Sequence, residues 1–208
     1  MKNICFFSGD ITRSGGTERV STVIANQLVK DEKLNICFLS LWENNEEMFY
    51  RLNDEIKRYT LFDEITSGKK ILSYIRKVRK FVKSQDIDVL IDIDGILDLY
   101  SIPALRRTKC KLISWEQFNY FYNPDGNYRK LTRKWASKKA DAIVVLTDED
   151  KNNYENETKI RGKVERIYNP IEQTTGNVAN YDINSKMIIS AGRLTAQKGF
   201  NMLVDVAD

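Results

Sequence analysis

The amino-terminal stretch reads KNICFFSGDITRSGGTERV over residues 2–20. Residues 2–7 form a short, mostly apolar run that predicts a β-strand, and the polar loop after it ends in Gly15-Gly16. From Thr17 onward, apolar side chains recur at the three- and four-residue spacing of a helix. A strand, a glycine pair and a helix start in this order can hold an anion against the N–H groups of the first helical turn. The same pattern fits equally well a tight βα turn that holds no ligand.

The alternation of short apolar runs with helical patterns continues along the chain. We expect further strands at 34–41, 56–61, 89–93, 111–115, 141–146, 164–168 and 187–191, and helices at 69–83, 97–107, 128–139, from 147 and from 200. This order predicts an α/β, Rossmann-like, doubly wound parallel sheet. In such sheets ligands bind at the carboxyl ends of the strands. The polar stretch 174–185 predicts a linker between a domain over 1–173 and the start of a second, similar domain over 186–208.

Composition excludes several classes of function. The 208 residues contain no histidine, so a catalytic triad or dyad based on histidine is excluded within this chain. A formal net charge of +4 is not typical of a nucleic-acid-binding protein. The cysteines at 5, 37 and 110 each lie in an apolar run, so we expect buried, reduced thiols of a cytosolic protein, with neither a disulfide framework nor a zinc site. No apolar run approaches the length of ~20 residues that a transmembrane helix needs.

Three other patterns leave alternatives open. The 69–83 helix is amphipathic and basic, and its basic face fits either plain solvation or an anionic membrane surface; its expected apolar side is Ile71, Leu72, Ile75, Val78, Phe81 and Val82. The aromatic cluster at 118–122 fits either core packing or a platform for a sugar acceptor. Asp92 and Asp94 are predicted to cap a loop rather than to bind a metal.

Four motifs in order resemble one known family. Gly192-Arg193-Leu194 with Lys198-Gly199-Phe200 resembles the donor-phosphate loop of the retaining glycosyltransferases of family 4, which have the GT-B fold. The stretches 15–20, 145–148 and 168–171 resemble the family's glycine loop and its later signatures. The resemblance implies transfer of a sugar from a nucleotide diphosphate sugar to a saccharide or lipid-linked acceptor, with retention and without an essential metal or other cofactor.

The resemblance also implies roles for particular residues. Arg193 and Lys198 would bind the donor diphosphate and stabilise its leaving charge, and Gly15 and Gly16 would form the donor-phosphate or acceptor loop. Relatives often carry a histidine after the strand that corresponds to 112–115, close to the transferred sugar. Here that role, if it is kept, would belong to Glu116 or Gln117.

The family's nucleotide pocket lies downstream of the lysine–glycine loop. We therefore expect the chain to be a fragment, natural or produced by cloning, with the acceptor-side domain and only the start of the donor-side domain, and inactive alone. We expect a cytoplasmic protein, peripheral to the inner face of the membrane if it binds an anionic surface, with no nucleic-acid partner. The alternative from another class is a non-catalytic Rossmann-like module that binds a phosphate or a partner protein.

Overall fold

The computed structural model describes residues 1–63, 71–123, 126–171, 182, 184–185, 189–192, 194 and 198–207. The chain divides into two compact units, Met1–Ile171 and Glu172–Asp208, and each is described here by itself. Arg193 and the larger part of the predicted linker lie outside the described residues.

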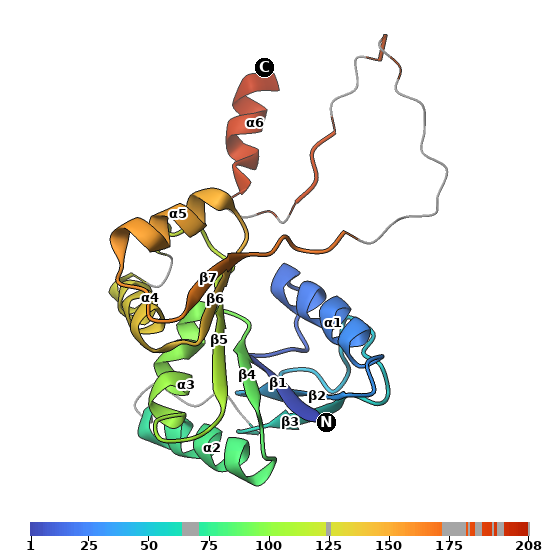
Figure 1. Cartoon of the computed structure of the whole chain (residues 1–208). Helices are drawn as coiled ribbons and strands as arrows, with labels where there is room; N and C mark the ends of the chain where they lie inside the picture. Colours follow the sequence, from blue (N-terminus) through green and yellow to red (C-terminus); the bar gives the residue numbers. More distant parts are fainter. Residues whose placement is uncertain are drawn as a thin grey trace. The chain divides into compact units, whose positions relative to one another are not determined.

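The first unit is built on one sheet of seven strands, all of them parallel (Figure 1). Their order is β3-β2-β1-β4-β5-β6-β7. The strands are β1 (Lys2–Ser8), β2 (Leu34–Ser40), β3 (Lys57–Thr60), β4 (Val89–Asp92), β5 (Lys111–Trp115), β6 (Ala142–Val145) and β7 (Lys163–Arg166). This confirms the predicted Rossmann-like parallel sheet.

Helices cover both faces of the sheet. They are α1 (Gly16–Leu28), α2 (Ile71–Ser84), α3 (Asp98–Ala104), α4 (Asn127–Lys139) and α5 (Asp148–Glu157), with a short 3₁₀ helix, η2 (Gly95–Leu97), before α3. In Figure 1, α1 lies on one side of the sheet and α2, α3 and α4 lie on the other. Of the expected helix over 97–107, residues 98–104 form α3, Leu97 belongs to η2, and residues 105–107 form a turn.

Side chains of the central strands point alternately to the two faces of the sheet, and each face has its own hydrophobic core. Phe6 stacks on Phe38 with ring centroids 5.2 Å apart, in the core that α1 covers. The intervening residues Cys5, Phe7 and Leu39 point to the other face, into the core that contains residues of α2, α4 and α5. Successive side chains of a strand point to opposite faces of the sheet. A sheet that helices cover on both faces therefore needs strands in which nearly every residue is apolar.

Two predictions about side chains are wrong. Helix α2 buries Tyr74, Val78 and Val82, which follow one another at four-residue spacing, whereas Leu72 is 66% exposed. Leu72 lies about a third of a turn away from the Val78 line, so it cannot share the buried stripe. Cys110 is only partly buried because it precedes the first residue of β5 at the rim of the sheet, whereas Cys5 and Cys37 are buried as expected.

The second unit contains helix α6 (Phe200–Ala207), which confirms the expected helix start. Of the strand expected over 187–191, the described residues 189–191 lie in neither a helix nor a strand. Among the described residues, no helix has the length and apolar character needed to cross a membrane.

Candidate functional site

The topology places a switch point between β1 and β4. From β1 the chain builds the sheet outward through β2 and β3, then returns to the other side of β1 with β4 and continues through β5, β6 and β7. Loops that leave adjacent strands in opposite directions open a crevice at their carboxyl ends, where open α/β sheets bind ligands. The glycine turn after β1 and the loops after β4 and β5 all belong to this carboxyl edge. The predicted Gly15, Gly16, Glu116 and Gln117 are therefore on the same edge of one sheet.

The two glycines of the first turn have different surroundings. Gly15 is the N-cap of α1, and a Cβ added to it would lie 2.1 Å from Glu18 Oε2. Glu18 is buried, accepts a hydrogen bond from the Thr17 hydroxyl at 2.7 Å and lies 3.9 Å from Arg13 Nε. Its carboxylate therefore already supplies negative charge at the positive end of the helix. Gly16, by contrast, is exposed, and an added Cβ would have no atom within 4 Å.

The loop that carries these glycines is anchored by a buried carboxylate. Asp10 accepts hydrogen bonds from the backbone N–H and the hydroxyl of Thr12 through Oδ1. Its Oδ2 accepts two more from the N–H and the side-chain amide of Asn44, in the segment after β2. The base of the glycine loop is therefore fixed to the neighbouring strand connection, while Arg13 at its tip is exposed.

Glu116 lies in a buried ion network. Its Oε1 accepts from Arg129 Nη1 at 3.0 Å and from the Phe118 N–H at 3.1 Å, and its Oε2 accepts from Arg133 Nε at 2.8 Å. Arg129 also makes a two-pronged contact with Asp94, at 2.7 and 3.2 Å. Glu116 is 2% exposed; burial raises the pKa of its carboxyl, and the charges of Arg133 and Arg129 act in the opposite direction.

Arg133 ties this network to the aromatic segment. Its Nη1 donates to the Tyr120 carbonyl and to Asn123 Oδ1, and its Nη2 donates to the Asn119 and Tyr122 carbonyls. With the Nε bond to Glu116, every N–H of the guanidinium is engaged. One side chain of α4 thus binds four residues of the segment 119–123.

The aromatic cluster divides into a core part and an exposed part. Tyr120 packs edge-on against the buried Tyr154, with centroids 4.9 Å apart. Phe121 and Tyr122 are 62% and 44% exposed. Core packing is therefore confirmed for Tyr120, whereas the exposed Phe121 and Tyr122 leave an acceptor platform as a prediction.

Gln117 differs from its neighbour in its hydrogen bonding. Within the described part of the chain, its Nε2 is buried and has no hydrogen-bond partner. A buried donor without a partner costs about 1–3 kcal/mol, so such a group usually pairs with water or a ligand. Glu116 is saturated and Gln117 is not, and the structure thereby separates two residues that the sequence could not rank.

The loops after β4 and β6 each contain a side chain that caps the following helix. Of the two aspartates predicted to cap a loop, Asp94 does so, whereas Asp92 is fully buried and caps no loop in the described structure. Asp94 accepts from the Ile96 N–H at the start of η2. Thr147 caps α5 by accepting from the Asp150 N–H at 3.0 Å, and its hydroxyl donates to Asp150 Oδ2. The other oxygen, Asp150 Oδ1, accepts from the Tyr120 N–H at 2.8 Å, so this cap also supports the aromatic segment.

In the second unit, Lys198 lies two residues before the start of α6, and Arg193 lies outside the described residues. Gly199 has φ +65°, a left-handed conformation in which glycine is unstrained. A Cβ at Gly192 would lie 3.3 Å from the Phe200 ring and 3.6 Å from Lys198 Cγ. The two halves of the Gly192…Phe200 motif thus lie against each other within this unit.

Comparison with known proteins gives the family. The sequence profile described as Glycosyltransferase Family 4 matches residues 14–174. The chain belongs to glycosyltransferase family 4. It is 33% identical over 207 residues to an uncharacterized glycosyltransferase of Haemophilus influenzae, covering 99% of this chain and 57% of that protein.

A second relative has a named activity. The family 4 chain is 32% identical over 162 residues to the GalNAc-alpha-(1->4)-GalNAc-alpha-(1->3)-diNAcBac-PP-undecaprenol alpha-1,4-N-acetyl-D-galactosaminyltransferase of Campylobacter jejuni. The match covers 76% of this chain and 43% of that enzyme. The chain thus spans about half the length of the curated relatives it matches.

Solved structures show the same fold. The lipopolysaccharide outer core galactosyltransferase WaaB, in its apo form, matches with a TM-score of 0.64 at 19% identity, over 88% of this chain and 50% of that one. The Anabaena protein HepE, in complex with UDP-glucose, matches with a TM-score of 0.54 at 10% identity. The match covers 81% of this chain and 44% of the HepE chain.

The candidate site contains two residues that the sequence did not single out. Arg129 and Arg133 belong to a helix with many basic residues, and nothing in their spacing distinguishes them from the exposed lysines beside them. Both are buried. Their four-residue spacing places both guanidiniums on one face of α4, but Lys130 and Lys134 have the same spacing, so the sequence alone does not mark the arginines as buried.

Proposed function

We propose that this chain is the acceptor-side part of a retaining glycosyltransferase. It would transfer a sugar from a nucleotide diphosphate sugar to a saccharide or lipid-linked acceptor in the synthesis of a cell-surface polysaccharide or other glycan. The observation that carries the proposal is the family 4 match over residues 14–174. In the same part of the chain, the exposed Gly16 lies beside the topological switch point of the sheet. The HepE complex with UDP-glucose and the undecaprenol-linked acceptor in the name of the C. jejuni enzyme support the two substrate classes.

The residues of the carboxyl edge divide between binding and positioning. Gly16 would let a substrate approach the backbone at the start of α1, and Gln117 Nε2 would donate to a sugar hydroxyl. Glu116 would act as a positioning residue, because both of its oxygens are bound to arginines.

Positive charge for the leaving group would come from the second unit. Arg193 and Lys198 would bind the donor diphosphate where negative charge develops as the sugar departs, in place of a metal ion. Fixed cations at that position lower the barrier because they stabilise the transition state more than the ground state. We further propose a cytoplasmic location, peripheral to the inner face of the membrane, where a lipid-linked acceptor would be reached.

The test uses the protein expressed from its complete gene, titrated by calorimetry with UDP, GDP and ADP. Loss of one charge-assisted phosphate contact in Lys198→Ala should weaken binding of the preferred nucleotide by about tenfold or more. Lys33→Ala, on the turn before β2, serves as the control and should change the affinity less than about twofold.

Unchanged affinity in Lys198→Ala would contradict the diphosphate assignment. Binding without transfer from any of the corresponding nucleotide sugars would instead favour the non-catalytic binding module. If transfer occurs, the anomeric configuration of the product, followed by NMR, tests retention directly.

A further inference from the structure

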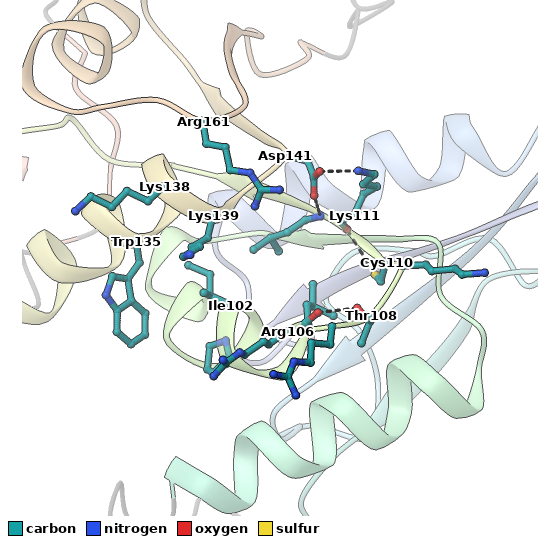
Figure 2. A pocket seen from close by; sticks show the side chains of 15 residues that line it. Ile102, Arg106, Thr108, Cys110, Lys111, Trp135, Lys138, Lys139, Asp141 and Arg161 are labelled. Carbon is teal, nitrogen blue, oxygen red and sulfur yellow. Dashed lines mark hydrogen bonds and ion pairs between the residues drawn. The ribbon is translucent and has the colours of Figure 1, made fainter.

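A hollow lies at the opposite edge of the sheet from the switch point. Its volume is about 900 Å³, and its walls come from the α3–β5 connection, the end of α4 and the α5–β7 connection. Lys111 is the first residue of β5, and Asp141 directly precedes β6, so the hollow opens at the amino ends of these strands. Figure 2 shows the indole of Trp135 at one end of the hollow and the Lys111–Asp141 pair at the other. Nothing in the proposed transfer reaction uses this edge.

The hollow has a large excess of positive charge. Seven basic side chains line it against one carboxylate. Partial burial raises the pKa of Asp141, but hydrogen bonds from Lys111 Nζ at 2.9 Å and the Leu112 N–H at 3.0 Å outweigh this and hold its pKa below the usual value. Burial raises the pKa of the Cys110 thiol to about 12, so it adds no negative charge at neutral pH.

Among the described residues, the other six cations form no ion pair, although the positive charge of Arg161 also helps to lower the pKa of Asp141. Within the described part of the chain, no ion pair or side-chain hydrogen bond is formed by Arg106, Arg107, Lys109, Lys138, Lys139 or Arg161. Like charges gathered in one concave surface repel each other, and concave walls focus the resulting field. Such a surface attracts anions strongly.

The walls are held in place by specific contacts. Arg79 of α2 donates at 2.7 Å to the carbonyls of both Ala104 and Arg106, which fixes the start of the α3–β5 connection. The Arg161 N–H donates at 2.8 Å to the Ser137 carbonyl of α4. A Cβ at Gly162 would lie 2.2 Å from the Asp141 carbonyl oxygen, so the backbone that carries Arg161 packs directly on the start of β6. The cations are therefore presented by an ordered frame.

We propose that this hollow is a binding site for phosphate-bearing anions, separate from the carboxyl edge. Guanidinium groups match phosphate oxygens in two-pronged contacts, and the three arginines with mobile lysines beside them suit a ligand with more than one anionic oxygen. The half-exposed indole of Trp135, with Ile102 and Pro103, gives the hollow an apolar side as well. The phosphate could come from an anionic lipid headgroup or from a soluble phosphate compound.

Two probes separate these sources. Vesicles of phosphatidylglycerol in phosphatidylcholine, compared with phosphatidylcholine alone, are tested by co-sedimentation, and inorganic pyrophosphate is tested by calorimetry. The double variant Lys139→Ala/Arg161→Ala should weaken binding of the relevant probe by about tenfold or more, with affinity falling steeply as salt is added. Trp135→Ala should weaken vesicle binding alone, because only a lipid source engages the apolar side.

Matched control variants test whether the loss of binding is specific to the hollow. Lys30→Ala/Lys33→Ala removes the same charge next to β2, which β1 and β4 separate from β5, and should change binding less than about twofold. Lys198→Ala should leave binding at the hollow unchanged, so failure here is distinguishable from failure of the proposed donor site. The proposal is overturned if neither probe binds, if the control pair weakens binding as much as the test pair, or if Lys198→Ala alone removes it.

Discussion

At the scale of single residues, the two neighbouring glycines have distinct roles. Gly15 leaves space for the buried Glu18 carboxylate, whereas Gly16 faces open space at the start of α1. A methyl group at Gly16 should not harm the fold, because alanine is a better helix former than glycine. A methyl group at Gly15 must displace Glu18.

This difference gives a paired prediction. Gly16→Ala should keep or slightly raise the melting temperature but lower the transfer rate of the protein by about tenfold or more, because the methyl group blocks close approach of substrate. Gly15→Ala should lower the free energy of unfolding by about 1–3 kcal/mol through the displaced carboxylate. Thermal unfolding and a transfer assay with the same preparations check both; full activity in Gly16→Ala would contradict the role proposed for it.

At the scale of secondary structure elements, α4 organises the loops of the carboxyl edge. Its two buried arginines join the η2 turn and the end of β5 through Asp94 and Glu116. Arg133 joins them to the aromatic segment through three backbone carbonyls, those of Asn119, Tyr120 and Tyr122. Gly95 is part of the same arrangement, because a Cβ there would lie 3.1 Å from Glu116 Oε2. Charges buried in this way persist only while every partner is present.

Arg133→Lys tests this organisation. The lysine keeps the charge but cannot donate to the four acceptors of residues 119–123 and to Glu116 together, so the free energy of unfolding should fall by about 2–4 kcal/mol. Urea unfolding measures the loss, and hydrogen exchange should show faster exchange at residues 119–123. The exposed neighbour Lys134, changed to alanine, should alter stability by less than about 0.5 kcal/mol. Unaltered exchange at 119–123 would show that Arg133 does not hold the segment.

At the scale of the whole molecule, a buried acid pair makes stability depend on pH. Asp92 at the end of β4 and Asp98 at the start of α3 are fully buried. Ser101 donates to Asp92 Oδ1 at 2.8 Å and Ser114 donates to Asp98 Oδ2 at 2.6 Å, and among the described residues the other oxygen of each carboxyl has no hydrogen-bond partner. Burial raises the pKa of Asp92 to about 7 and that of Asp98 well above its usual value. Near neutral pH the pair therefore holds a proton that the unfolded chain, with aspartate pKa values of about 3.9, has released.

The sign of the pH effect follows from this difference in bound protons. Between about pH 4 and pH 7 the folded state binds more protons than the unfolded state, so the pair contributes a loss of stability as pH rises, with a slope of up to about 1.4 kcal/mol per pH unit for each extra proton. Asp98→Asn keeps a neutral hydrogen-bonding group there and should flatten the slope. Urea unfolding at pH 5, 6, 7 and 8 measures it, with the exposed Glu32→Gln as control. Equal slopes in wild type and Asp98→Asn would contradict the shared proton.

Local patterns determined much of this protein from sequence alone. Three features depend only on residues within about one helical turn or one strand of each other: the strands of the first unit, the capping of α5 by Thr147 and the family motifs. Over such short distances, the periodicity of apolar residues and the length of side chains decide the structure. The consequence that a parallel sheet gathers its loops at one edge also follows from the order of strands and helices.

Tertiary structure alone decided which side chains meet. The sequence offered Glu116 as a candidate for contact with the transferred sugar, but two arginines of α4 bind both of its oxygens, and the side chain is buried. The basic hollow likewise joins three chain segments far apart in sequence, which no local pattern connects. Burial and ion pairing depend on the packing of distant elements in three dimensions, so a charge's neighbours become known only once the sheet and its helices are assembled.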